Sequence, residues 1–119
     1  MIGRLIAIFF LSRELAHREH LRTQSYAQHM ALGSFYEEVV GIADSIAEAY
    51  QGRNGIIKDI PMLDTKASGP IDVVLEAQLG MIEKIRYTAV EKNDTAIQNL
   101  IDEAVALYLS TLYKLRNLR

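Results

Sequence analysis

The sequence predicts an all-α fold of four helices in a single domain over residues 1–119. Apolar residues recur at helical spacing in four stretches, and no alternation typical of β-strands competes with them. The 7 glycines and 2 prolines are too few to interrupt those stretches often. Half of the residues are hydrophobic and 24% are charged, which is typical of a globular chain. A chain of 119 residues buries one modest core, so we expect it to associate with copies of itself.

The first helix is predicted from about Ile2 to Leu21. It carries two apolar stripes, which we expect to pack on the chain's own core and on a neighbouring subunit. The first stripe is Ile2, Leu5, Ile6 and Phe9, and the second is Ile8, Leu11 and Leu15. The apolar run over residues 5–11 has no cleavage site of the usual form after it and is far shorter than the roughly 20 residues that cross a bilayer. We therefore expect a buried helix rather than a signal peptide or a membrane span.

The second helix is predicted to begin after an N-cap at Thr23 or Ser25 and to continue to about Gln51, where Gly52, Asn54 and Gly55 end it. Residues 52–70 are rich in Gly, Asn, Asp, Pro and Ser around a small apolar patch. This composition indicates a long connection, with room for a short helix, that crosses from one end of a bundle to the other.

The third helix is predicted to open with Pro70 at its first position, and the fourth to follow a turn at Asn93 and Asp94. Thr95 and Gln98 have the spacing of a capping box at the start of the fourth helix. The core stripes are Ile71, Val74, Leu75, Gln78, Ile82, Ile85 and Ala89 in the third helix, and Ile97, Leu100, Ile101, Ala104, Tyr108, Leu112 and Leu115 in the fourth. Two helical hairpins joined by a long crossover between helices two and three predict a four-helix bundle of ferritin-like connectivity.

Composition excludes several functions and partners. With no cysteine, the chain forms no disulfide and no thiolate metal site, which fits a cytoplasmic location. A formal charge of −2 gives no general attraction to nucleic acid or to an anionic membrane. The C-terminal Lys114, Arg116 and Arg119 are explained as favourable charges at a helix C-terminus. We therefore expect neither nucleic acid nor a membrane as a partner.

Three histidines and two carboxylates between residues 16 and 52 are the candidate metal ligands. They are His17, His20, His29, Asp44 and Glu48. Imidazole and carboxylate without thiolate suit Fe(II), Mn(II) or Zn(II), and carboxylates suit the oxidation of Fe(II) to Fe(III). The alternative is that these residues are exposed or cap helix ends, in a metal-free helical oligomer with a structural or partner-binding role.

Helix geometry decides how such a site could form. Asp44 lies about 60° around the second helix from His29, and Glu48 about 100°, so all three face broadly the same side. However, His29 and Asp44 are roughly 22 Å apart along the helix axis, which no single ion spans. An antiparallel pairing of the second helix with its own copy brings residue 29 to residues 44–48. The midpoint falls near Glu37, with Gly33 and Gly41 four residues to either side, where two backbones could approach closely.

These residues also carry a family resemblance. The stretch Ala-His-Arg-Glu-His-Leu-Arg-Thr over residues 16–23, followed by His29, Phe35, Asp44 and Glu48, resembles the mini-ferritins, the Dps-type proteins of bacteria. The chain is also similar to small ferritin-like proteins of tailed phages. The resemblance implies a ferroxidase that sequesters iron, with His20 and His29 from one subunit and Asp44 and Glu48 from another, in a hollow dodecamer that stores ferric oxide.

The match has one ambiguity and two departures. By motif His20 is the first-helix ligand, whereas by counting it is His17, which lies twelve residues before His29. We favour His20 and keep His17 as the second choice. Mini-ferritins usually carry an acidic residue where this chain has Gly33, which puts the second iron position in doubt. The Lys-rich N-terminal tail with which some members bind DNA is missing, since the predicted first helix begins almost at Met1.

Overall fold

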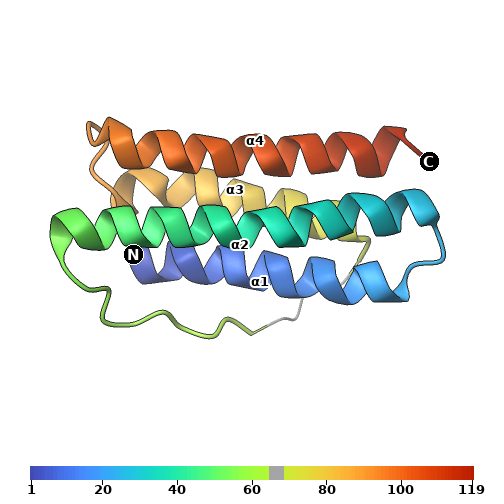
Figure 1. Ribbon diagram of the computed structural model, residues 1–119, viewed down its shortest axis with the longest axis horizontal. Coiled ribbons are helices and arrows are strands. Elements are labelled where there is room, and N and C mark those ends of the chain that lie inside the picture. The colour runs from blue at the N-terminus through green and yellow to red at the C-terminus, as the bar shows by residue number, and fades with distance from the viewer. Residues whose placement is uncertain (65–68) are drawn as a thin grey trace.

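The computed structural model describes residues 1–64 and 69–119 and contains four α-helices (Figure 1). They are α1 (Ile2–Arg22), α2 (Tyr26–Asn54), α3 (Ile71–Ala89) and α4 (Thr95–Asn117). No β-strand occurs over these two ranges. The prediction of an all-α chain with four helices is therefore confirmed. None of the described helices is both long enough and apolar enough to cross a bilayer.

The helices lie side by side in a bundle that measures 44 × 25 × 21 Å. α1 packs against α2 and α3, and α4 packs against the same two helices, so α1 and α4 occupy opposite corners. Figure 1 shows that α1 and α4 run in one direction while α2 and α3 run in the other.

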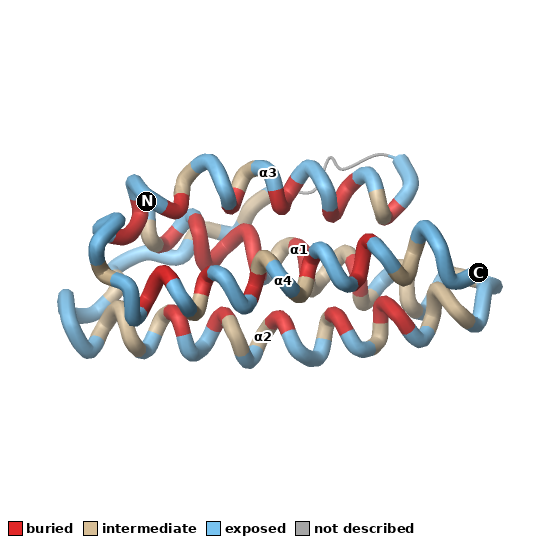
Figure 2. Tube along the Cα trace, turned by 90° about the horizontal axis from the view of Figure 1, so that it is seen from above, coloured by how far each residue is buried: buried red, intermediate tan, exposed pale blue. Residues whose placement is uncertain are grey.

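The core lies between the four helices, where the buried residues gather along the inner faces (Figure 2). Tyr108 of α4 lies in it, with its ring edge-on to Phe35 at 4.9 Å and 6.4 Å from the ring of Phe9. Each large apolar side chain buried in this way stabilises the fold by about 1.5–3 kcal/mol. Ile8, from the second apolar stripe of the first helix, is fully buried within the chain, whereas Leu11 and Leu15 are half-buried.

The boundaries of α2 differ slightly from prediction. Of the two predicted N-caps Ser25 is the one observed, since its hydroxyl accepts a hydrogen bond of 3.2 Å from the amide of Gln28. α2 continues through Gly52 to Asn54 and ends at Gly55, whose φ of 92° suits a residue without a side chain. Gly52 therefore lies inside the helix rather than ending it.

After α2, the described residues 55–64 pass beside α1. A Cβ added to Gly3 would overlap the carbonyl group of Asp59, so this close approach depends on glycine. Ile60 and Leu63 line a surface depression together with Phe10 of α1. No helix forms over residues 55–64. The predicted connection over residues 52–70, which had room for a short helix, also includes residues 65–68, and these lie outside the described residues.

Compared with the prediction, α3 starts one residue later and α4 starts one residue earlier. Pro70 is the N-cap of α3 and Ile71 its first residue. Asp94 is the N-cap of α4, and its carboxylate accepts a hydrogen bond of 3.4 Å from the amide of Ile97. Arg53 at the end of α2 forms an ion pair of 2.8 Å with the same carboxylate. Asp94 therefore both caps α4 and links it to α2.

The predicted capping box at the start of α4 is wrong because Gln98 faces the interior. Its side-chain oxygen accepts a hydrogen bond of 2.9 Å from Arg86 of α3, and its amide nitrogen donates to the carbonyls of Arg86, Val90 and Glu91. The Arg86 guanidinium is buried and also pairs with Asp102 at 2.7 Å. A buried cation is costly unless hydrogen-bond acceptors surround it. The side chain of Gln98 therefore bonds to Arg86 and does not cap the start of α4.

Candidate metal site

The candidate site lies where α1 ends and α2 begins. The short turn over residues 23–25 folds α2 back on α1 and places His20 beside His29. Their imidazole rings stack with a centroid distance of 3.7 Å and an angle of 17° between the planes. Both side chains are half-buried, so the pair remains accessible from one side.

Two reciprocal hydrogen bonds fix this pair. Nδ1 of His20 donates to the carbonyl oxygen of His29 at 2.6 Å, and Nδ1 of His29 donates to the carbonyl oxygen of His20 at 2.7 Å. A carbonyl oxygen can only accept, so each Nδ1 carries the proton. In the neutral imidazole the lone pair is then on Nε2. Metal-binding histidines commonly donate their other ring nitrogen to a backbone carbonyl in this way, which fixes the tautomer and the ring orientation.

The bond from His29 also has a structural role. The carbonyl of His20 is in the last turn of α1, where the final carbonyls have no partner within the helix. The amide of Thr23 already satisfies the carbonyl of Glu19. His29 therefore caps the end of α1, and this role is compatible with a free Nε2.

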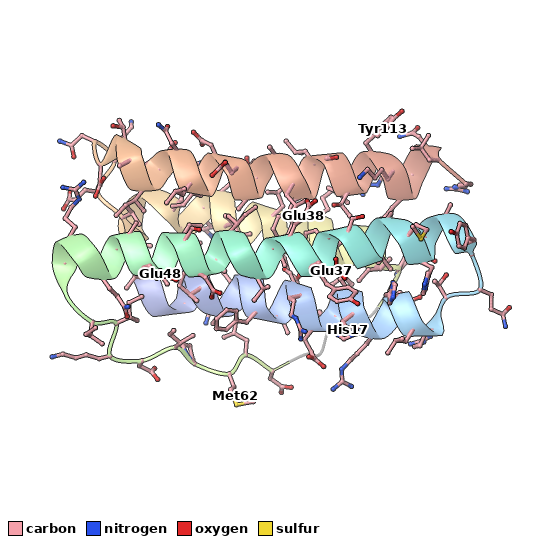
Figure 3. All side chains as sticks on the ribbon, viewed as in Figure 1. His17, Glu37, Glu38, Glu48, Met62 and Tyr113 are labelled. Carbon is pink, nitrogen blue, oxygen red and sulfur yellow. The ribbon has the colours of Figure 1, made fainter. Side chains whose placement is uncertain are left out.

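His17 stacks on Tyr36 rather than on either histidine of the pair. The rings of His17 and Tyr36 stack at 4.1 Å with an angle of 11°, and the Tyr36 ring meets His20 edge-on at 5.2 Å. The rings of His17 and His20 are 6.3 Å apart. Figure 3 labels His17 on α1, in the same half of the bundle as Glu37. Of the two alternatives for the first-helix ligand, the structure thus brings His20 to His29.

Asp44 and Glu48 are exposed on the outer face of α2, away from the histidine pair (Figure 3 labels Glu48). Neither carboxylate forms an ion pair within the described ranges. Among those residues, no group of three or more His, Asp or Glu side chains in one chain is close enough to hold an ion. Within a single chain, the predicted ligands therefore form two separate groups, the histidines at the junction of α1 and α2 and the carboxylates farther along α2.

Sequence reasoning missed the role of Gly33 within the chain. A Cβ at this position would lie 3.0 Å from Cε1 and 3.3 Å from Nδ1 of His20. Contacts this short are rare for real Cβ atoms, so a side chain at residue 33 would displace the imidazole. Only the position of His20 across the α1–α2 turn reveals this role, because the two residues are on different helices.

Comparison with known proteins gives one family match. A family of unknown function, DUF5856, matches residues 20–115, which is more than half of the chain. The chain belongs to the DUF5856 family. No curated protein and no solved structure shows significant similarity to it. The DUF5856 match begins at His20, so it takes in His29, Asp44 and Glu48 and leaves out His17.

Proposed function

We propose that this protein is a ferritin-like ferroxidase that binds Fe(II), oxidises it with peroxide or oxygen, and sequesters the Fe(III) in an oligomeric shell. Each site lies between two copies paired antiparallel through α2. His20 and His29 come from one copy, and Asp44 and Glu48 come from the other. The observation that carries the proposal is the reciprocal hydrogen bonding of the two histidines, which leaves both Nε2 atoms as ligands.

The path of the chain supports a ferritin-like bundle. α2 and α3 run in the same direction, and residues 55–64 lie beside α1 on the way back (Figure 1). A bundle of two antiparallel hairpins joined by one long crossover has this arrangement.

Pairing two copies through α2 completes the ligand set. An antiparallel arrangement centred near Glu37 places residue 29 of one copy opposite residues 44–48 of the other. Gly33 of one copy then lies opposite Gly41 of the other. Gly41 is exposed and has no side chain to keep the helices apart, whereas a side chain at residue 33 would point to His20 of its own chain. Asp44 and Glu48 are exposed in the single chain, which is expected of residues that are covered only when two copies pair.

The ligand chemistry fits the oxidation of iron. Two neutral imidazoles and two carboxylates balance the charge of Fe(II) and leave one positive charge on Fe(III). The carboxylates stabilise the more highly charged ion more strongly, so they favour loss of the electron to the oxidant. The imidazoles hold the substrate ion without adding charge.

The test compares two replacements of His29. Asparagine carries its amide nitrogen where histidine carries Nδ1, so His29→Asn keeps the hydrogen bond to the His20 carbonyl and removes Nε2, whereas His29→Ala removes both. Fe(II) is added without oxygen, peroxide follows, and ferric absorbance is recorded in the near ultraviolet. We expect the wild type to show the rise and both variants to lose it, with stability retained by His29→Asn. Wild-type oxidation rates in His29→Asn would overturn the proposal.

A second candidate is a metal-free helical oligomer with a structural or partner-binding role. The cap that His29 provides on α1 favours it, because that bond needs no metal. In this case His29→Ala lowers the free energy of unfolding by about 1 kcal/mol, the usual worth of one hydrogen bond, and metal binding is weak in every variant. Elemental analysis of the purified protein, together with light scattering for the subunit number, separates the two candidates.

A further inference from the structure

Before its last turn, α2 carries exposed acidic residues and no lysine or arginine, and Arg53 is its one cation. Between Tyr26 and Gly52 the acidic residues are Glu37, Glu38, Asp44 and Glu48, and all four are exposed. Figure 3 labels three of them along α2. From Ser34 to Glu48 the other exposed residues are small, and they are Ser34, Gly41 and Ser45. Nearer the start of α2, Tyr26 and Met30 are exposed as well. A second copy would therefore meet a negative surface.

Antiparallel pairing sets these charges against each other. Glu37 lies at the midpoint and faces its own copy. Arg13 of α1 lies beside Tyr36, the neighbour of Glu37, with its guanidinium 5.8 Å from the centre of the Tyr36 ring and 3.7 Å from Glu14. Arg13 is thus already beside a carboxylate of its own helix, and it offsets the repulsion only in part. Like charges brought together at an interface oppose association, most strongly where two backbones approach closely.

We infer that association through α2 is coupled to divalent cations, so that two copies pair when the ions are bound and separate when they are removed. The inference rests on the proposed function, because the ions occupy the sites formed by His20, His29, Asp44 and Glu48. Each ion places positive charge between the two acidic faces. It also joins the imidazole-bearing end of one α2 to the carboxylate-bearing part of the other. Linkage then requires that metal tightens the dimer by the same factor as dimerisation tightens metal binding.

The expected size of the effect follows from two equivalent sites per dimer. With free metal at about ten times the dissociation constant of a site, each site favours the dimer by a factor of about 11. Two sites together strengthen association roughly 100-fold. A change of this size is readily measured.

The experiment is sedimentation velocity on the full chain with Co(II) alone or with EDTA, and Co(II) absorbance measures binding independently. We expect the dimer dissociation constant to rise roughly 100-fold in EDTA. Asp44→Asn removes a ligand and should abolish association driven by Co(II). Glu37→Gln lies outside the ligand set, so it should strengthen the metal-free dimer and still bind Co(II). Glu103→Gln, at an exposed acidic residue of α4, is the matched control and should change neither.

The outcomes separate the inference from the proposed function. If Co(II) binds and the dimer is equally strong in EDTA, the coupling is wrong and the metal site stands. If Co(II) does not bind, the proposed function fails, and the coupling fails with it. If Asp44→Asn still associates on addition of Co(II), the ion links the copies through other residues and the inference is overturned.

Discussion

Replacing Gly33 with alanine tests whether this glycine makes room for the His20 imidazole. Gly33, Gly41 and Gly80 all lie inside helices, where glycine is less favourable than alanine by about 0.5–1 kcal/mol. A Cβ at Gly41 or Gly80 would meet no atom within 4 Å. We therefore expect Gly41→Ala and Gly80→Ala to raise the free energy of unfolding by about 0.5–1 kcal/mol.

At Gly33 the same substitution should lower the free energy of unfolding. The new Cβ, 3.0 Å from Cε1 of His20, displaces a ring that is held by a hydrogen bond of 2.6 Å and by stacking on His29. Losing one hydrogen bond costs about 1 kcal/mol. Losing the stacked arrangement costs a further 0.5–1.5 kcal/mol or so. The ring needs to shift by only a few tenths of an ångström, so these values are upper limits, and we expect Gly33→Ala to be less stable than Gly41→Ala by up to about 2 kcal/mol.

Urea unfolding followed by circular dichroism measures the difference, with EDTA and low protein concentration to keep the chain monomeric. The slope of the free energy of unfolding against urea concentration should be the same in each variant, since unfolding exposes a similar surface. If Gly33→Ala gains as much stability as the two controls, the imidazole moves aside freely and Gly33 does not position it.

Two further predictions concern the polar groups of the core. Gln98→Ala deprives the buried Arg86 of an acceptor and should cost about 2–4 kcal/mol, seen as a lower urea midpoint; a cost below about 1 kcal/mol would contradict the assigned network. Burial raises the pKa of the Tyr108 phenol above its ordinary 10.0, so the folded state favours the neutral form. Its contribution to stability is complete below about pH 10 and is lost as the pH rises further. Tyr108→Phe removes a hydroxyl that has no hydrogen-bond partner among the described residues, so we expect little change in stability at neutral pH and a smaller loss of stability at about pH 11 than in the wild type.

The helices could be predicted because their signals are local. Apolar periodicity and the N-cap at Ser25 each depend on residues within one or two turns of a helix. The structure has the four predicted helices, with Ser25 as the N-cap of α2. Of the residues predicted to end the second helix, Gly55 does so with a positive φ, whereas Gly52 lies inside the helix, where a single glycine is tolerated. The predicted capping box with Gln98 is wrong because the Gln98 side chain accepts a hydrogen bond from Arg86 of α3 instead.

For the candidate site, the sequence alone determined the ligand types and their separation along one helix. From these it follows that His29 and Asp44 of one chain cannot share an ion. Only the tertiary structure decided that His20 rather than His17 meets His29, that each Nδ1 donates to a backbone carbonyl, and that Gly33 leaves room for the ring. The physical reason is that residue spacing along a helix is fixed by its pitch, whereas contacts between helices depend on how a turn directs one helix against another.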